Sequence, residues 1–81
     1  MNDLIKDLKT IGRRMYRIRR AHGLTQEDVA IASGISTRNY AGIERGTTNL
    51  RLQTLVRICE TLNVTPDELV TEKRIVIEVE V

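Results

Sequence analysis

The spacing of hydrophobic residues predicts that the chain begins with an amphipathic α-helix. Apolar residues recur at alternating intervals of four and three, the period of one helical stripe, at Leu4, Leu8, Ile11, Met15 and Ile18. Arginines occupy other directions of the same helix. Because glycine favours the left-handed conformation that ends many helices, this helix is expected to stop at His22-Gly23.

A second, short helix is expected at about residues 25–33. Thr25 can cap its first turn, and Asp28 can accept a hydrogen bond from the backbone N–H of the capping residue. The charge of Asp28 also suits the positive end of the helix dipole. Gly34 is expected to end this helix.

The third helix follows after a turn of only three residues, 34–36. Ser36 can cap this helix, which is expected to run to Arg45 with Gly46 as its terminator. Two helices joined by a tight, glycine-containing turn form a helix-turn-helix, the unit that lays its second helix in the major groove of DNA.

Two further helices complete the helical pattern. After a connector at residues 47–50, a fourth apolar stripe contains Leu52, Leu55, Ile58, Cys59 and Leu62. A fifth, short helix is expected to open at residues 65–68. There Thr65 caps, Pro66 occupies a position that needs no N–H donor, and Glu68 completes a capping box. The expected fold class is all-α.

The last eight residues change to a repeat of two. Aliphatic side chains alternate along this segment with Val76, Glu78 and Glu80, at Ile75, Ile77, Val79 and Val81. No second strand is apparent in the sequence, and a lone strand leaves its backbone groups unpaired, so we expect pairing with another chain, most simply a symmetry mate. The expected organisation is a DNA-binding domain at residues 1–73 and a dimerisation strand at residues 74–81.

The composition is that of one small domain of 81 residues, 41% hydrophobic and 30% charged. It contains no Trp or Phe, so a mainly aliphatic core is expected. The longest stretch without a charge, residues 29–37, is far shorter than the roughly 20 apolar residues of a membrane span. The single cysteine, Cys59, excludes an internal disulfide and favours a cytoplasmic location.

Charge is distributed unevenly along the chain. Residues 1–57 contain 11 basic and 5 acidic side chains, whereas residues 58–81 contain 2 and 6, so the net charges are +6 and −4. This asymmetry suggests a polyanion partner for the first part. His22 is the only histidine, and the sequence has neither a glycine-rich phosphate loop nor a metal-ligand cluster. No enzymatic activity, metal, cofactor, membrane or small-molecule ligand is therefore expected.

Residues 11–70 resemble the Cro and cI repressor-like family of DNA-binding domains. The resemblance depends mainly on four short segments: residues 23–30 (GLTQEDVA), 34–36 (GIS), 43–46 (IERG) and 62–64 (LNV). It implies a five-helix, lambda-repressor-like helix-turn-helix fold. Residues 42–45 together with Asn49-Leu50 resemble in particular the restriction-modification controller proteins.

Within the third helix, positions at 100° intervals predict which side chains face DNA. The outward sector contains Arg38, Ala41, Gly42 and Arg45. Arg38 is the first choice for a bidentate pair with guanine O6 and N7, whereas Arg45 suits a backbone phosphate. The small residues would let the helix sit deep in the groove. Further DNA contacts are expected at Gln26, Thr37, Asn39, Thr47, Thr48 and Asn49.

The opposite, inward sector contains Tyr40, Ile43 and Glu44. A buried carboxylate needs a partner. For Glu44 the family resemblance points to Arg19, in an ion pair between the first and third helices that leaves spare guanidinium donors for a phosphate. The resemblance also implies that Gln26 touches a phosphate and braces the first side chain of the third helix.

Together these features predict a sequence-specific, double-stranded DNA-binding transcriptional regulator that acts as a homodimer on a near-palindromic operator. The sequence departs from the family pattern at Tyr16, Tyr40, Ala41 and Gly42, so direct base readout is expected to be sparse and DNA deformability important. The alternative is an antitoxin-like or other protein-interaction module whose C-terminal strand pairs with a different protein.

Overall fold

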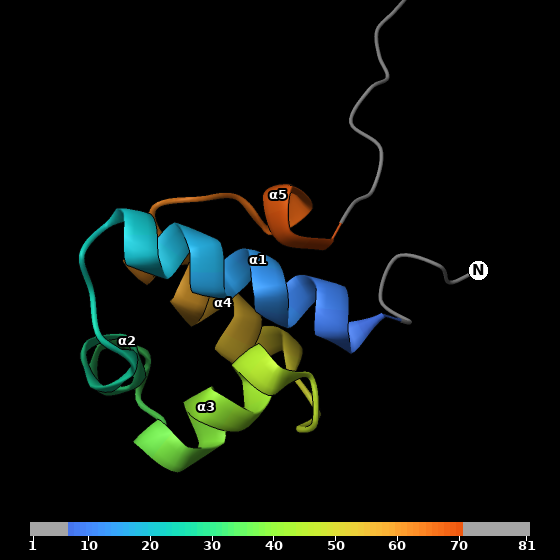
Figure 1. Cartoon of the computed structure of the whole chain (residues 1–81), viewed down its shortest axis with the longest axis horizontal. Helices are drawn as coiled ribbons and strands as arrows, with labels where there is room; N and C mark the ends of the chain where they lie inside the picture. Colours follow the sequence, from blue (N-terminus) through green and yellow to red (C-terminus); the bar gives the residue numbers. More distant parts are fainter. Residues whose placement is uncertain (1–6, 71–81) are drawn as a thin grey trace, which may run out of the picture.

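The computed structural model describes residues 7–70, which form five α-helices and no strand. The helices are α1 (Leu8–Ala21), α2 (Gln26–Ser33), α3 (Thr37–Arg45), α4 (Leu52–Leu62) and α5 (Pro66–Val70). Figure 1 shows α3 on the side of the domain opposite α5, with α1 and α4 between them. The all-helical prediction is confirmed for this part of the chain. The predicted strand at residues 74–81, and with it the boundary at residue 73, lies outside the described residues.

The helix ends lie where local hydrogen bonding can stop or start them. α1 begins after Asp7, whose carboxylate accepts a hydrogen bond from Thr10 N at 3.1 Å, and Leu4, the first position of the predicted stripe, lies outside the described residues. α2 has the predicted capping box, in which Asp28 N donates to Thr25 Oγ1 at 3.0 Å and Thr25 N donates to Asp28 Oδ2 at 2.8 Å. The boundary between α1 and α2 therefore follows from the sequence locally.

The same holds for α3 and α5. Ser36 Oγ accepts from Asn39 N at 3.0 Å at the start of α3, and Gly46 ends that helix with φ of 77°. At the start of α5, Thr65 N donates to Glu68 Oε2 at 3.0 Å. A left-handed backbone at Gly46 turns the chain back across the end of α3.

The core is a single cluster of mainly aliphatic side chains in which all five helices take part. Its buried members are Ile11, Met15, Val29, Ala30, Tyr40, Ile43, Leu55, Ile58, Cys59, Leu62 and Leu69. The predicted stripe of α4 is wrong at Leu52, which is 74% exposed. Leu52 is the first residue of α4, where the helix extends past the cluster, so periodicity alone placed it inside.

A close approach of α1 to α3 fixes the position of the helix-turn-helix. Gly12 is buried, and a Cβ atom built there would lie 2.5 Å from Ile43 O and 2.7 Å from Glu44 C. The two backbones can therefore meet only because residue 12 lacks a side chain. α3 contacts both α1 and α2, so it is held from two directions, and α2 in turn packs against α4.

Candidate nucleic-acid interface

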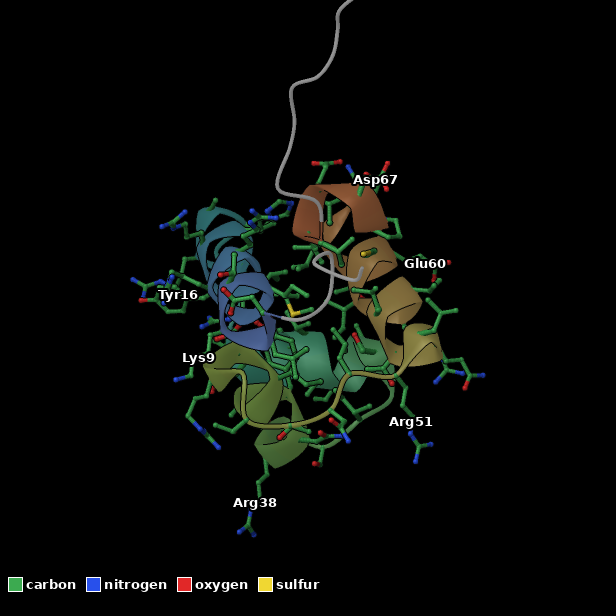
Figure 2. The ribbon with its side chains drawn as sticks, turned by 90° about the vertical axis from the view of Figure 1, so that its right-hand side faces the viewer. Lys9, Tyr16, Arg38, Arg51, Glu60 and Asp67 are labelled. Carbon is green, nitrogen blue, oxygen red and sulfur yellow. The ribbon has the colours of Figure 1, made fainter. Side chains whose placement is uncertain are left out.

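The first turn of α3 is exposed to solvent and free to meet a partner. Thr37, Arg38 and Asn39 are all exposed, whereas Tyr40 is fully buried one position later. Figure 2 shows Arg38 pointing away from the body of the domain, at the end opposite Asp67. This is the placement that readout of a groove by the start of a helix requires.

The end of α3 and the loop after it form a second exposed segment. Arg45, Thr47 and Asn49 are exposed, and Thr48 is half-buried. The loop folds back on the helix, because Thr47 N donates to Gly42 O at 3.0 Å and Thr47 Oγ1 donates to the same oxygen at 3.3 Å. The predicted phosphate contacts at residues 45–49 thus lie together at one end of α3.

Gly42 does not lie in an outward sector, and this part of the sequence prediction is wrong. The residue is buried, and a Cβ atom there would clash with Thr48 Oγ1 and lie 3.2 Å from Thr48 Cβ. The small size of Gly42 therefore makes room for the returning loop.

Arg19 and Glu44 meet in a buried ion pair between α1 and α3. Arg19 Nε donates to Glu44 Oε2 at 2.6 Å and Arg19 Nη2 donates to Glu44 Oε1 at 3.1 Å, and the Glu44 side chain is only 5% exposed. Arg19 Nη1 donates to Leu24 O at 2.8 Å, so one of the donors expected to be spare for a phosphate holds the loop before α2.

Gln26 adds α2 to this network, but not where the sequence analysis expected it. The resemblance implied a contact with the first side chain of α3, whereas Gln26 Nε2 donates to Glu44 Oε1 at 3.0 Å, near the other end of that helix. Burial opposes ionisation of Glu44, yet Arg19 and Gln26, which donate hydrogen bonds to its carboxylate, outweigh this effect and lower the pKa of Glu44. Burial, followed by the neighbouring Glu44 carboxylate, raises the pKa of Tyr40.

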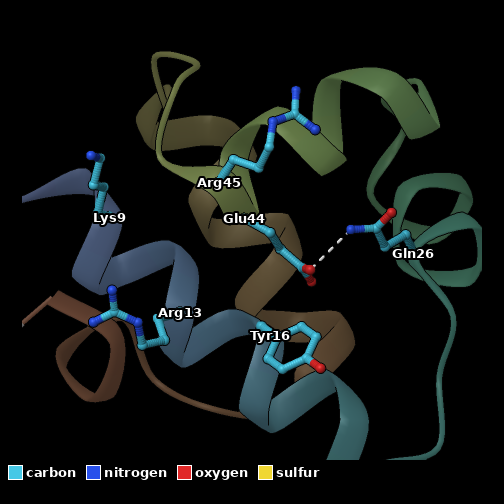
Figure 3. Close-up of a pocket in the computed structure, with 6 residues that line it drawn as sticks. All are labelled: Lys9, Arg13, Tyr16, Gln26, Glu44 and Arg45. Carbon is cyan, nitrogen blue, oxygen red and sulfur yellow. Dashed lines mark hydrogen bonds between the residues drawn. The ribbon is translucent and has the colours of Figure 1, made fainter.

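A hollow of about 480 Å³ lies beside this network, between α1 and the end of α3. Its lining is mostly cationic or polar: Lys9, Arg13, Tyr16, Gln26, Glu44 and Arg45. Figure 3 shows side chains from α1, α2 and α3 gathered around it. The sequence analysis missed the contributions of Lys9 and Arg13, although with Tyr16 and Arg20 they recur at intervals of four, three and four, a helical stripe that could have identified them.

The charge asymmetry of the sequence has a counterpart in space. In Figure 2, Arg38 lies at one end of the domain, whereas Glu60 and Asp67 lie toward the other. α3 therefore projects from the end of the domain remote from these acidic residues, as expected for a surface that approaches a polyanion.

Metal or thiol chemistry would need suitable side chains within residues 7–70. No cluster of three or more His, Cys, Asp or Glu side chains there could hold a metal ion. Cys59 is buried, and burial followed by the charge of Glu68 raises the pKa of its thiol. None of the helices in the described part is both long and apolar enough to cross a bilayer.

Comparison with known proteins identifies the fold that this geometry represents. The profile of the helix-turn-helix family matches residues 15–69, which is more than half of the chain. The chain belongs to this helix-turn-helix family. The recognition of a Cro/cI-type domain from the sequence is therefore confirmed. Because members of the family are DNA-binding transcriptional regulators, double-stranded DNA as a partner and the absence of enzymatic activity are confirmed at the level of the family.

Individual relatives of this helix-turn-helix protein are regulators. It is 41% identical over 63 residues to the uncharacterized HTH-type transcriptional regulator y4dJ of Sinorhizobium fredii, covering 78% of this chain and 82% of that protein. It is 36% identical to the restriction-modification controller protein C.AhdI of Aeromonas hydrophila, with a TM-score of 0.75 and coverage of 78% and 96%. The controller protein C.Esp1396I is 33% identical, with a TM-score of 0.69 and coverage of 74% and 79%.

Proposed function

We propose that this helix-turn-helix protein is a sequence-specific transcriptional regulator that binds a near-palindromic DNA operator as a homodimer. The observation that carries the proposal is the division of α3 into an anchored half and a projecting half. Tyr40, Ile43 and Glu44 fix the helix to the core, and Arg38 extends from its start into solvent. An exposed guanidinium on a rigid helix is pre-organised for recognition.

In this proposal Arg38 reads a base edge and the residues around it hold the backbone. A bidentate pair of Arg38 with guanine O6 and N7 discriminates against other bases by about 1–3 kcal/mol. Thr37 and Asn39 flank it at the mouth of the groove. The backbone phosphates are held by Gln26, Arg45, Thr47, Thr48 and Asn49.

Two substitutions at Arg38 test the readout. Selection of bound sites from random duplexes first provides the operator. Arg38→Ala then weakens binding to the selected half-site by about 5- to 150-fold while non-specific affinity is nearly unchanged. Arg38→Lys keeps the charge but lacks the planar fork, so it loses the same sequence preference. An equal loss on all sequences would assign Arg38 to phosphate and refute base readout.

The operator geometry follows from the two-fold symmetry of a homodimer. Two copies of α3 enter successive major grooves about 34–36 Å apart, which is one helical turn of 10–10.5 base pairs. Inserting five base pairs between the selected half-sites puts them on opposite faces of the duplex and abolishes cooperative binding. Inserting ten base pairs restores the shared face. Affinity that is indifferent to these insertions contradicts the dimeric arrangement.

The dimer contact is proposed at residues 74–81, with Ile75, Ile77, Val79 and Val81 as its apolar face. A hollow of about 360 Å³ lined mainly by aliphatic side chains supports this, because it includes both the exposed Leu52 and Val70, the last described residue. Ile75 follows Val70 by five residue-to-residue steps, which can span at most about 17 Å. The proposed apolar face is therefore tethered within reach of this uncovered apolar surface.

A matched pair of surface substitutions tests this contact. Leu52→Glu removes an apolar side chain from the hollow, whereas Ile31→Glu changes a residue of α2 that is equally exposed, at 71% against 74%. Burial of one leucine contributes about 1.5–3 kcal/mol, so Leu52→Glu raises the dimer dissociation constant at least about tenfold. Deletion of residues 74–81 gives a monomer. A wild-type monomer in sedimentation would instead favour pairing of the strand with a different protein.

A further inference from the structure

The hollow between α1 and α3 is lined in part by cationic side chains of α1, which lies outside the helix-turn-helix. Lys9 and Arg13 of α1 line it opposite Arg45 of α3. None of these three cations forms a close ion pair with another described residue, although the charge of Arg13 acts on the exposed carboxylate of Asp7. Three like charges around one depression repel each other unless an anion lies among them.

The acidic residue that lines the same hollow does not neutralise these cations. Both carboxylate oxygens of Glu44 accept hydrogen bonds from Arg19, and one also accepts from Gln26. The Glu44 side chain is almost completely covered, so its charge is already balanced inside the protein. The open side of the hollow is therefore positively charged.

The positions of the two α1 cations are fixed by backbone packing. A Cβ atom at Gly46 would lie 2.7 Å from Lys9 Cα and 2.8 Å from Lys9 N, so the start of α1 rests directly on the end of α3. Lys9 thereby lies next to Arg45, and Arg13 follows one turn later on α1. This arrangement is part of the folded domain and needs no partner to form it.

Tyr16 closes the hollow on its third side. The guanidinium carbons of Arg19 and Arg20 each lie 5.4 Å from the centroid of the Tyr16 ring, and Arg20 Nη1 donates to Tyr16 Oη at 2.8 Å. These contacts hold the ring in place. Because its oxygen accepts from Arg20, the hydroxyl can still donate its own hydrogen outward.

We propose that this hollow binds a phosphate of the DNA backbone, with Lys9 and Arg13 of α1 as contacts in addition to those of α2 and α3. The inference rests on the proposed DNA-binding function, because Gln26 and Arg45, the proposed phosphate contacts of the helix-turn-helix, line the same hollow. A strand held by Arg45 passes over Lys9 and Arg13. α1 thus neutralises backbone on the flank of the groove that α3 enters.

The salt dependence of DNA binding by the full chain tests this directly. Removal of one phosphate contact makes the slope of log K against log[salt] shallower by about 0.9. Lys9→Gln and Arg13→Gln each reduce the slope by up to this amount, which corresponds to an about 3.5-fold smaller loss of affinity between 50 and 200 mM salt. The control is Arg17→Gln, because Arg17 is an exposed arginine of α1 that lines neither this hollow nor the one beside the start of α2. Its slope stays that of the wild type.

The location of the phosphate is tested with neutral methylphosphonates placed one at a time in the selected operator. One such replacement weakens wild-type binding but has no further effect on the Arg13→Gln protein. If Arg45→Gln lowers the slope and neither α1 variant does, the α1 contact is overturned while the proposed function stands. If Arg17→Gln lowers it equally, the effect is one of net charge and the hollow is not a site. If the wild type binds no duplex, both proposals fail.

Discussion

Substitution of Gly12 by alanine tests how this fold holds α3 in place. Gly12 lies inside α1, where a glycine ordinarily lowers helix stability by about 1 kcal/mol relative to alanine. By helix propensity alone, Gly12→Ala would therefore stabilise the protein. The structure predicts the opposite sign, because the added methyl group would lie 2.5 Å from Ile43 O and 2.7 Å from Glu44 C.

The magnitude follows from the kind of atoms that the methyl group meets. They belong to the backbone of α3, so no side-chain rotation can relieve the overlap and the two helices must move apart. Overpacking of a core costs about 1–3 kcal/mol, and this rigid case belongs at the upper end. After the gain of about 1 kcal/mol in helix propensity, the net loss is about 2 kcal/mol, or a fall in Tm of roughly 8–16 °C for a domain of this size.

Urea unfolding followed by circular dichroism measures this loss. The protein concentration is kept fixed, because a dimer would make stability depend on concentration. Gly42→Ala is the matched control. Its methyl group also meets a close neighbour, but the neighbour is the side chain of Thr48 at the edge of the domain, which can rotate away. We expect a smaller loss there, below about 1 kcal/mol. A Gly12→Ala protein as stable as the wild type, or more so, would refute the proposed close packing of α1 on α3.

Three further predictions concern the interior and one helix start. The lowered pKa of Glu44 means that its contribution to stability is present above its unfolded pKa of about 4.3 and is lost as pH falls through the lower folded value. Unfolding free energy measured from pH 6 to 3 should therefore fall less steeply in Glu44→Gln, and an unchanged slope would argue against the ion pair. Thr25→Ala removes the α2 cap and costs about 1 kcal/mol in urea unfolding, whereas no loss would mean that the capping box contributes nothing. The buried thiol of Cys59 should react with a thiol reagent only at the rate of unfolding, and immediate reaction of the native protein contradicts its burial.

The helix boundaries could be predicted from the sequence because each depends on residues within one turn. Thr25 and Asp28 bond to each other's backbone, and Gly46 adopts the left-handed conformation that ends α3. Such signals need no knowledge of the remaining chain. The pairing of Arg19 with Glu44 came from family resemblance, since two residues 25 positions apart carry no local signal.

Two of the errors concern which residues are exposed, and this depends on other segments of the chain. A helical wheel places Gly42 outward because it cannot represent the loop that returns through Thr47 and covers it. It places Leu52 inward because it cannot show where the helix passes the edge of the core. The pattern of α1 does place Lys9 and Arg13 on one helical stripe, but only tertiary packing shows that this stripe lies beside Arg45.

Glu44 helps to explain how so short a helix can present its first turn to a partner. Its carboxylate joins α3 to α1 through Arg19 and to α2 through Gln26, and Arg19 in turn binds Leu24 O in the segment between those two helices. The bonds that Glu44 accepts lie at the C-terminal half of α3. A helix of 9 residues fixed so firmly at one end projects its other end as a rigid extension. Because the side chains of residues 37–39 are exposed, we expect their chemistry to vary with little effect on the fold.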